Sequence, residues 1–235
     1  MQEILKNIHL IKLGAVNAYL IDHGGLTLID TGYPGSEKKI FGYLNKIGRR
    51  PEQIEQVIVT HLHTDHSGSL AAIQAATGTR VLMHPADAAM VMEGRSFREQ
   101  VEIAPGFVNK IVYNLMIKNV PRTIEPVKAD AFLEDGQVLP VGEGLKVIHA
   151  PGHAEGQVAL LYQDPASILF AADTCGSMMG LALAPFYENL QQGRESLGRL
   201  GAIEFEAATF GHGKPIMKDA AHRFRKKFGS LVETA

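Results

Sequence analysis

The feature that most restricts the fold of this chain is a run of four potential metal ligands within six residues. The run is His61-Leu62-His63-Thr64-Asp65-His66, and it directly follows residues 57–60, whose β-branched side chains are typical of a buried strand. In a chain with 10 histidines, chance would produce on the order of 0.0007 such matches. We therefore expect the strand to end at a rim where more distant parts of the chain complete a metal site.

The spacing of these four residues favours two metal ions over one. Residues two apart in an extended chain point the same way, so His61 and His63 can bind one cation together. Asp65 and His66 then turn toward a neighbouring position. A single ion cannot take all four side chains and more distant ligands while keeping a position open for water.

Three further ligand candidates each follow a predicted strand. They are His153, Asp173 and His212. Glycines beside His153 and His212 allow the backbone to approach closely, and the two carboxylate oxygens of Asp173 suit it to bridge two metals. Alone, each residue has an ordinary alternative as a surface or core histidine or as a helix cap. Their order after the four-residue run favours the metal site.

The remaining histidines lack such a context, and we interpret them as structural or exposed. They are His9, His23, His84, His149 and His222.

Hydrophobic periodicity predicts strands and helices in alternation along the chain. Strands are predicted at residues 8–13, 16–22, 26–30, 57–60, 80–84, 145–149, 157–162, 168–171 and 207–210. Helices are predicted at residues 36–47, 70–76 and 189–200 and beyond Met217. No fixed-period repeat relates the two halves, and the hydrophobic fraction of 46% is enough for a substantial core. We expect a single domain over residues 1–235.

One segment, residues 97–120, carries an apolar stripe that the strand pattern does not require. The stripe has helical spacing and consists of Phe107, Val108, Ile111, Val112, Leu115 and Met116. We interpret it as part of a helical lid inserted at about residues 86–130. We expect most of the stripe to pack on the body of the domain, with a substrate-facing wall or a dimer contact as the alternatives.

Composition argues against several classes of partner. The 23 basic and 25 acidic residues give a net charge of -2, which provides no field to attract nucleic acid. The longest apolar candidate for a membrane span, residues 107–120, is interrupted by Asn109, Lys110, Asn114 and Lys118. The first residues alternate polar and apolar and do not resemble a secretion signal. With Cys175 as the single cysteine, we expect a cytoplasmic protein with neither membrane nor nucleic-acid partners.

In the order and spacing of its ligand candidates, the chain resembles the metallo-β-lactamase superfamily over nearly its whole length, including the glyoxalase II and lactonase-like metal-dependent hydrolases. The resemblance implies an α/β fold, the αββα four-layer sandwich of two mixed β-sheets flanked by helices. It also implies that the Asp30-Thr31-Gly32 turn supports the ligands, with a plain turn after a strand as the alternative. The ligand set that it implies is His61, His63 and His153 for the first metal, Asp65, His66 and His212 for the second, and Asp173 as the bridge.

The function that we expect is hydrolysis by a metallo-hydrolase with a dinuclear zinc site, with iron or manganese as alternative metals. Two divalent cations would make hydroxide available near neutral pH, and Asp65 would be the catalytic residue that orients it and relays its proton. The substrate would be an ester, lactone or thioester of a partly apolar small molecule. Four residues near Asp173 suggest an apolar pocket, with a place in the core as the equal alternative: Met178, Met179, Leu181 and Phe186.

Departures from better-known relatives leave the substrate open. Asp173 disfavours the true β-lactamases, which lack a bridging aspartate at that point, and Gly176 replaces a tyrosine of the acyl-homoserine lactonases. Residues 151–157 also differ from the corresponding segment of glyoxalase II enzymes. The alternatives are an iron-dependent sulfur dioxygenase or related redox enzyme on the same scaffold, and third a nuclease. The oligomeric state stays open between a monomer and a homodimer.

Overall fold

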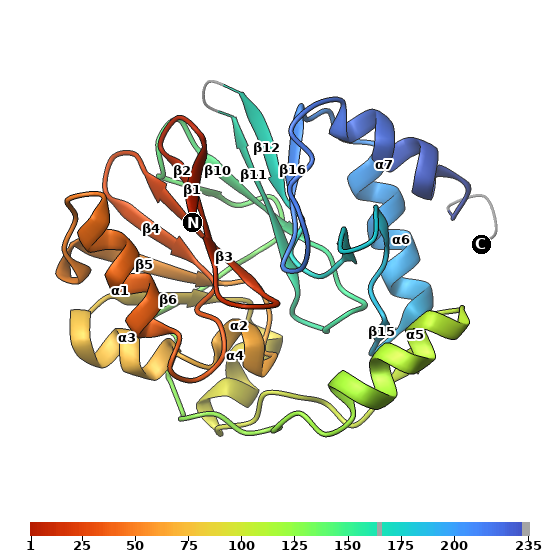
Figure 1. Cartoon of the computed structure of the whole chain (residues 1–235), viewed down its shortest axis with the longest axis horizontal. Helices are drawn as coiled ribbons and strands as arrows, with labels where there is room; N and C mark the ends of the chain where they lie inside the picture. The colour runs from red at the N-terminus through yellow and green to blue at the C-terminus, as the bar shows by residue number, and fades with distance from the viewer. Residues whose placement is uncertain (164–165, 232–235) are drawn as a thin grey trace.

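Two facing β-sheets with helices on their outer faces make up the fold (Figure 1). The computed structural model describes residues 1–163 and 166–231, except for the side chains of Met116 and Ser230. The first sheet has the strand order β1-β2-β3-β4-β5-β6-β8. Its strands are β1 (Gln2–Leu5), β2 (Ile8–Lys12), β3 (Asn17–Asp22), β4 (Leu26–Ile29), β5 (Ile54–Val59), β6 (Arg80–Met83) and β8 (Ala131–Phe132).

The second sheet has the strand order β16-β12-β11-β10-β9. Its strands are β9 (Val138–Leu139), β10 (Leu145–His149), β11 (Val158–Gln163), β12 (Ser167–Phe170) and β16 (Ala207–Thr209). Both sheets are mixed, because β4, β5, β6 and β8 pair in parallel in the first and β12 pairs in parallel with β16 in the second. The remaining neighbours in both sheets are antiparallel.

Helices on each outer face complete the four layers. The first sheet is covered by α1 (Glu37–Lys46), α3 (Leu70–Thr77) and α4 (Pro85–Met92), and the second by α6 (Leu190–Gly201) and α7 (Ala220–Phe228). The other short elements are η1 (Pro51–Gln53), α2 (Thr64–Ser67), β7 (Glu102–Ile103), α5 (Phe107–Val112), η2 (Tyr113–Ile117), β13 (Cys175–Gly176), β14 (Ala182–Leu183), β15 (Phe186–Tyr187) and η3 (Gly229–Leu231).

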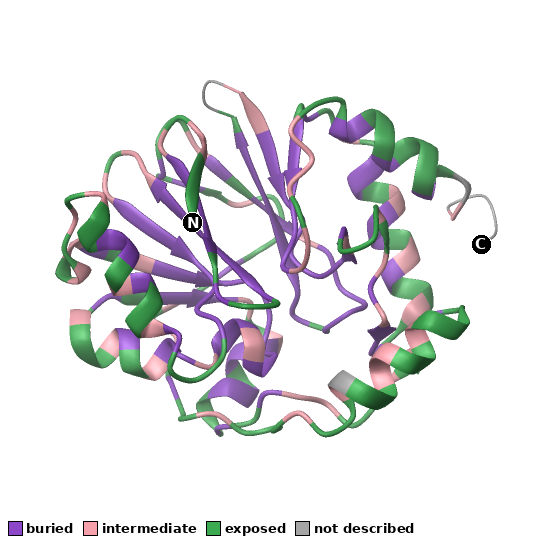
Figure 2. Ribbon diagram, in the orientation of Figure 1, coloured by how far each residue is buried: buried purple, intermediate pink, exposed green. Residues whose placement is uncertain are grey.

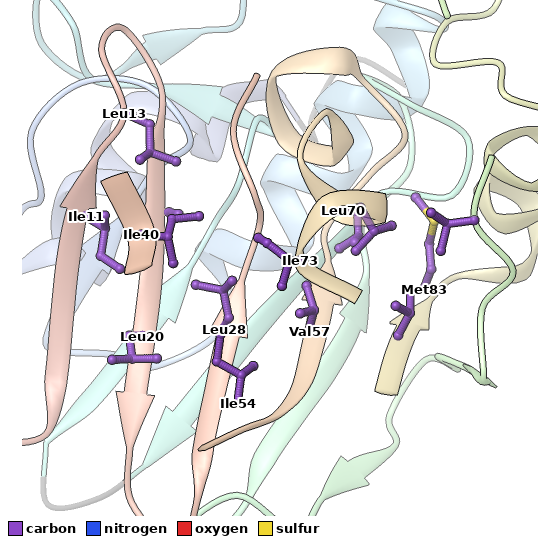
Figure 3. Close-up of a cluster of buried hydrophobic side chains, with 14 of the residues drawn as sticks. Ile11, Leu13, Leu20, Leu28, Ile40, Ile54, Val57, Leu70, Ile73 and Met83 are labelled. Carbon is purple, nitrogen blue, oxygen red and sulfur yellow. The ribbon is translucent and has the colours of Figure 1, made fainter. Parts of the chain in front are cut away.

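Successive side chains of a strand point to opposite faces of the sheet, which explains why three apolar layers form. One lies between the two sheets, and one lies under the helices of each sheet. In β5, Val57 and Val59 pack under the helices, whereas Ile58 faces the second sheet. Figure 3 shows the outer cluster, where Leu28 of β4 lies near Ile73 of α3. Because side chains on both faces of the sheet are buried (Figure 2), the run Val57 to Val59 is apolar without interruption.

The αββα fold implied by the resemblance is confirmed. Most predicted strands and helices match within a few residues, but β1 was not predicted, and β5 begins earlier, at Ile54. Among the described residues, no helix combines the length and apolar character needed to cross a lipid bilayer.

The segment predicted as a lid differs from expectation in two ways. Helix α4 lies within residues 86–130 but packs on the first sheet through Ala88 and Val91, so only the later part stands apart. The expectation that the apolar stripe packs on the body is wrong for four of its residues, because Phe107, Val108, Ile111 and Leu115 are exposed. The side chain of Met116 lies outside the described residues.

Candidate metal centre

The strands bring the seven ligand candidates to one rim of the sandwich. In the first sheet, the four-residue run follows β5, while Asp30 follows the parallel strand β4. In the second sheet, β10, β12 and β16 run in the same direction. The residues that follow them are His153, Asp173 and His212. Loops from both sheets therefore meet where their strands end.

The seven side chains form three overlapping groups. In each group the potential ligand atoms lie within 4.8 Å of one another. The groups are His61, His63 and His153; His61, His66 and Asp173; and Asp65, His66 and His212. The first and last groups share no residue, and each has the three ligands that a separate ion would need.

Asp173 lies between these two groups. Its Oδ2 atom is 3.1 Å from Nε2 of His212 and 3.6 Å from Nε2 of His66. The same oxygen is 3.7 Å from Nε2 of His153, which belongs to the other group. A single carboxylate thus reaches histidines of both groups, as a bridging ligand must.

Four of the histidines are oriented by a hydrogen bond at Nδ1. His61 pairs with Thr60 Oγ1, and His66 pairs with Asp30 Oδ2 at 2.8 Å. His153 and His212 pair with the backbone carbonyls of Phe186 and Ala15. A ring whose Nδ1–H donates in this way has an unprotonated Nε2 when neutral, so each of the four rings can offer an inward-facing lone pair in its neutral form.

Asp30 supports the ligand loop from behind, as the resemblance implied. Its buried carboxylate accepts hydrogen bonds from the backbone N–H and the hydroxyl of Thr60, and it pairs with His66. The hydroxyl of Thr60 is in turn the partner of His61. Asp30 therefore fixes two of the candidate ligands and is more than a residue of a plain turn.

The ligand loop is only partly extended. The backbone of His63 is extended, with φ −58° and ψ 147°, but α2 begins at Thr64. Asp65 and His66 therefore lie on a helical turn, which redirects their side chains toward the second group. The turn after His63 agrees with expectation, but the chain bends at residues 60–62, so the expected extended pair of His61 and His63 does not form.

Glycines make room for the loops that carry His153 and His212. Gly152 has φ +131°, and a Cβ there would collide with the backbone of Gly193. A Cβ at Gly211 would collide with Oδ1 of Asp173 and lie 2.6 Å from Cε1 of His66. Side chains are excluded at both positions by close packing.

The two groups differ in charge. Burial lowers the pKa of His61, His63 and His153, and neighbouring histidines lower that of His61 and His63 further.

For the second group, burial opposes protonation of the histidines, but nearby carboxylates outweigh it. Asp173 is the strongest of these, and the pKa values of His66 and His212 are raised well above the ordinary value. Burial likewise opposes ionisation of Asp65 and Asp173, but the same two histidines lower the pKa of both carboxyls. Asp65 and Asp173 are therefore ionised at neutral pH.

An aromatic wall stands beside the first group. The ring of Phe97 stacks on His63 with centroids 4.8 Å apart, and Phe186 contacts both His63 and His153. Tyr113 of η2 contacts Phe186 at 6.0 Å. Of these residues, sequence reasoning identified only Phe186.

Sequence reasoning also missed Tyr33 and the ion pair of Arg98 with Asp87. Burial and the negative charges of Asp65 and Asp173 raise the pKa of Tyr33 to about 12, so its phenol is a hydrogen-bond donor at neutral pH. The signal for it is its position directly after the Asp30-Thr31-Gly32 turn. Arg98 contacts the buried carboxylate of Asp87, and no sequence periodicity indicates that pair.

The residues present fit a metal centre. Buried atoms without a hydrogen-bond partner among the described residues include Nε2 of His61, Nε2 of His66 and Oδ1 of Asp173. Nε2 of His153 also lies 3.0 Å from Nδ1 of His63, close enough for one ion to bind both. Leaving such atoms buried and unpaired costs about 1–3 kcal/mol each, which coordination would remove.

Two hydrolases are among the known proteins that are similar to this chain. The acyl-coenzyme A thioesterase MBLAC2 of Gallus gallus is 29% identical over 133 residues, 52% of this chain and 43% of that protein. The hydroxyacylglutathione hydrolase of Pseudomonas aeruginosa strain PAO1 is 27% identical over 177 residues, 72% of this chain and 50% of that enzyme. The chain thus spans half or less of these relatives' own length.

The fold also occurs in solved structures. A β-lactamase from Chitinophaga pinensis has a TM-score of 0.69 with 23% identity, and the match covers 97% of this chain and 87% of that one. A sequence model of one protein family matches residues 11–200. The chain belongs to that family, the metallo-beta-lactamase superfamily.

Proposed function

We propose that this protein is a hydrolase that holds two divalent cations and cleaves an ester, lactone or thioester of a partly apolar small molecule. Zinc is the metal that we favour at both positions. The observation that carries the proposal is the convergence of the inward-facing Nε2 atoms with the carboxylates of Asp65 and Asp173. His61, His63 and His153 would hold one ion, Asp65, His66 and His212 the other, and Asp173 both.

When bound, two such cations lower the pKa of water toward neutrality and polarise a carbonyl under attack. Asp65 is the residue that we assign to proton transfer. Its Oδ2 lies 3.1 Å from Nε2 of His212, and its lowered pKa keeps it ionised at neutral pH. An ionised carboxylate at this position would orient an attacking water and take up its proton. The same carboxylate then returns the proton to the leaving group.

Two other features select and orient the substrate in this proposal. Phe97 and Phe186 offer an apolar surface beside His63 for the acyl part of the substrate. The phenol of Tyr33, protonated at neutral pH, donates a hydrogen bond to a substrate oxygen on the side of Asp65.

A thioester is the substrate class that the relatives favour. The names of the Gallus gallus and Pseudomonas aeruginosa relatives describe a thioesterase and a hydrolase of an acylated thiol, glutathione. Both are distant and longer than the matched region, so they support the reaction class and leave the acyl group open.

The test is a panel of thioesters, esters, lactones and phosphodiesters, assayed with the purified protein before and after metal removal by a chelator. We expect thioester or ester cleavage that disappears on chelation and returns with zinc. Asp65→Asn should lower kcat by about 100-fold or more. Activity confined to small, highly charged phosphates, or full activity of the Asp65→Asn variant, would refute the proposal. Iron in the purified protein with oxygen consumption would favour the dioxygenase alternative.

A further inference from the structure

A second cluster of buried charges lies behind the His61, His63 and His153 group. It consists of Asp87, Arg98 and Glu188, whose side chains are 0%, 18% and 9% exposed. Nη1 of Arg98 lies 2.7 Å from Oδ1 of Asp87 and 3.3 Å from Oε1 of Glu188. Nη2 of Arg98 donates to the carbonyl of Ala86 at 2.8 Å, which fixes the plane of the guanidinium. We call these three residues the charge clamp.

Asp87 joins the two loops that carry the first group of ligands. Its Oδ2 accepts a hydrogen bond of 3.0 Å from the backbone N–H of Leu62, which stands between His61 and His63. Its Oδ1 accepts one of 2.9 Å from the backbone N–H of Gly156, shortly after His153. A Cβ at Gly156 would lie 2.5 Å from Cγ of Asp87, so the loop is packed directly on the carboxylate.

Glu188 holds the same loop from its other side. Its Oε2 accepts a hydrogen bond of 2.7 Å from the backbone N–H of Glu155. Glu188 also follows Phe186 closely in the chain, and the carbonyl of Phe186 is the partner of Nδ1 of His153. The position of Glu188 therefore affects both the loop and the ring orientation of His153.

Arg98 connects this arrangement to the segment that follows α4. The preceding residue, Phe97, stacks on the ring of His63. Nη1 of this guanidinium donates to both buried carboxylates, while Nη2 of the same fork donates to the carbonyl of Ala86. Without it, both carboxylates would be buried and uncompensated, and the loops that they hold would shift or the carboxylates would take up protons.

The second group of ligands has a different support. His66 is held by Asp30, and His212 by the carbonyl of Ala15. Among the described residues, the charge clamp makes no hydrogen bond or ion pair with Asp65, His66 or His212. The charge clamp thus contacts the loops of the first group only, whereas Asp30 supports His66 directly and His61 through Thr60.

We infer that the charge clamp of Asp87, Arg98 and Glu188 is a positioning device that sets the metal affinity of the His61, His63 and His153 site and leaves the Asp65, His66 and His212 site unaffected. The inference rests on the proposed two-metal centre and adds to it a separate control of one half.

Two backgrounds isolate the two sites. His212→Ala removes a ligand of the second site only, and His153→Ala removes one of the first. In each background, two proteins are compared, one that keeps Arg98 and one that carries Arg98→Met. Their zinc affinity is measured by competition with a chromophoric chelator. We expect Arg98→Met to weaken zinc binding by about 10- to 100-fold in the His212→Ala background and by less than about threefold in the His153→Ala background.

Arg95→Met is the matched control. Arg95 lies three residues from Arg98, is 55% exposed, and forms an ion pair with the exposed Glu93. It should leave zinc affinity unchanged in both backgrounds. Equal weakening by Arg98→Met in both backgrounds, or no weakening in either, would overturn the inference.

Circular dichroism and thermal unfolding of the metal-free variants separate loss of folding from loss of affinity. If Arg98→Met does not fold, Arg98→Lys takes its place, because lysine keeps the charge and loses the fork. It should weaken the first site by about 3- to 10-fold, with the second site unchanged. If the parent variants bind no zinc, the proposed function fails. If they bind zinc and neither Arg98 variant changes the first site selectively, only the charge clamp fails.

Discussion

Gly211 illustrates how closely the backbone approaches the candidate metal ligands. It precedes His212, and a Cβ added to it would collide with Asp173 and crowd His66. Gly211 does not have a positive φ, so its backbone conformation is one that any residue can adopt. Glycine is therefore required here because no space remains for a side chain between two candidate ligands, Asp173 and His66.

Gly211→Ala should accordingly displace Asp173 or His66. We expect zinc affinity to fall by about tenfold or more, because a small misplacement of a ligand is enough to weaken a site. Gly42→Ala is the control, because Gly42 lies within α1 with nothing within 4 Å of the added Cβ. That change should raise the free energy of unfolding by about 0.5–1 kcal/mol and leave zinc binding intact. Wild-type zinc affinity in Gly211→Ala would show that the close contact is unimportant.

The opposite pKa shifts of the histidines imply different pH dependence for the two sites. His66 and His212 have raised pKa values and carry protons at neutral pH in the metal-free protein, so a metal ion must displace them. Burial lowers the pKa of His61 and His153, which are already neutral. Affinity should therefore rise with pH at the second site and change little at the first.

This difference can be measured with the His153→Ala and His212→Ala variants. Between about pH 6 and about pH 8, zinc affinity should rise steeply in His153→Ala, which keeps the second site, and stay nearly level in His212→Ala. Calorimetry in two buffers should also detect proton release for the second site. The same slope for both variants would contradict the assigned charges.

At the scale of elements, two helices that both carry apolar residues differ in what those residues contact. In α7, Phe224 is fully buried and its ring contacts Phe205, Phe210 and Phe228. In α5, Phe107 is 77% exposed. Apolar residues at helical spacing therefore do not by themselves predict that a helix face is buried.

Substitution should separate these two helices clearly. Phe224→Ala should lower the free energy of unfolding by about 3–5 kcal/mol, because it removes a large side chain from a packed cluster. Phe107→Ser should change it by no more than about 0.5 kcal/mol. Chemical denaturation of both variants provides the comparison. A large loss in Phe107→Ser would mean that α5 packs on the body.

The strands could be predicted from the sequence because burial on both faces of a sheet requires apolar side chains at successive positions. Residues such as Val57 and Ile58 face two different apolar layers, which produces an unbroken β-branched run. The ligand loop was recognisable because four ligand types lie within six residues. Local patterns of this kind need no knowledge of distant contacts.

The charge clamp could not be predicted for the opposite reason. Asp87 lies in the first turn of α4, where an acidic residue is ordinary, and its partner Arg98 lies beyond the helix. Glu188 comes from the other half of the chain. Contacts between residues so far apart leave no periodic signal, and the exposed side of α5 likewise depends on how the helix is docked.

At the scale of the whole molecule, the candidate centre lies where the two sheets meet. His61 follows a strand of the first sheet, and Asp173 follows a strand of the second. A pair of cations held there would link the two halves of the sandwich. A two-metal centre at this place therefore requires that residues from both sheets bind the ions at once.

The most direct measurement is the zinc content of the protein after saturation and removal of free metal. We expect about two zinc ions per chain in the wild type and about one in each of His153→Ala and His212→Ala. A content near zero in the wild type, or a single ion that either substitution removes completely, would contradict the two-metal centre.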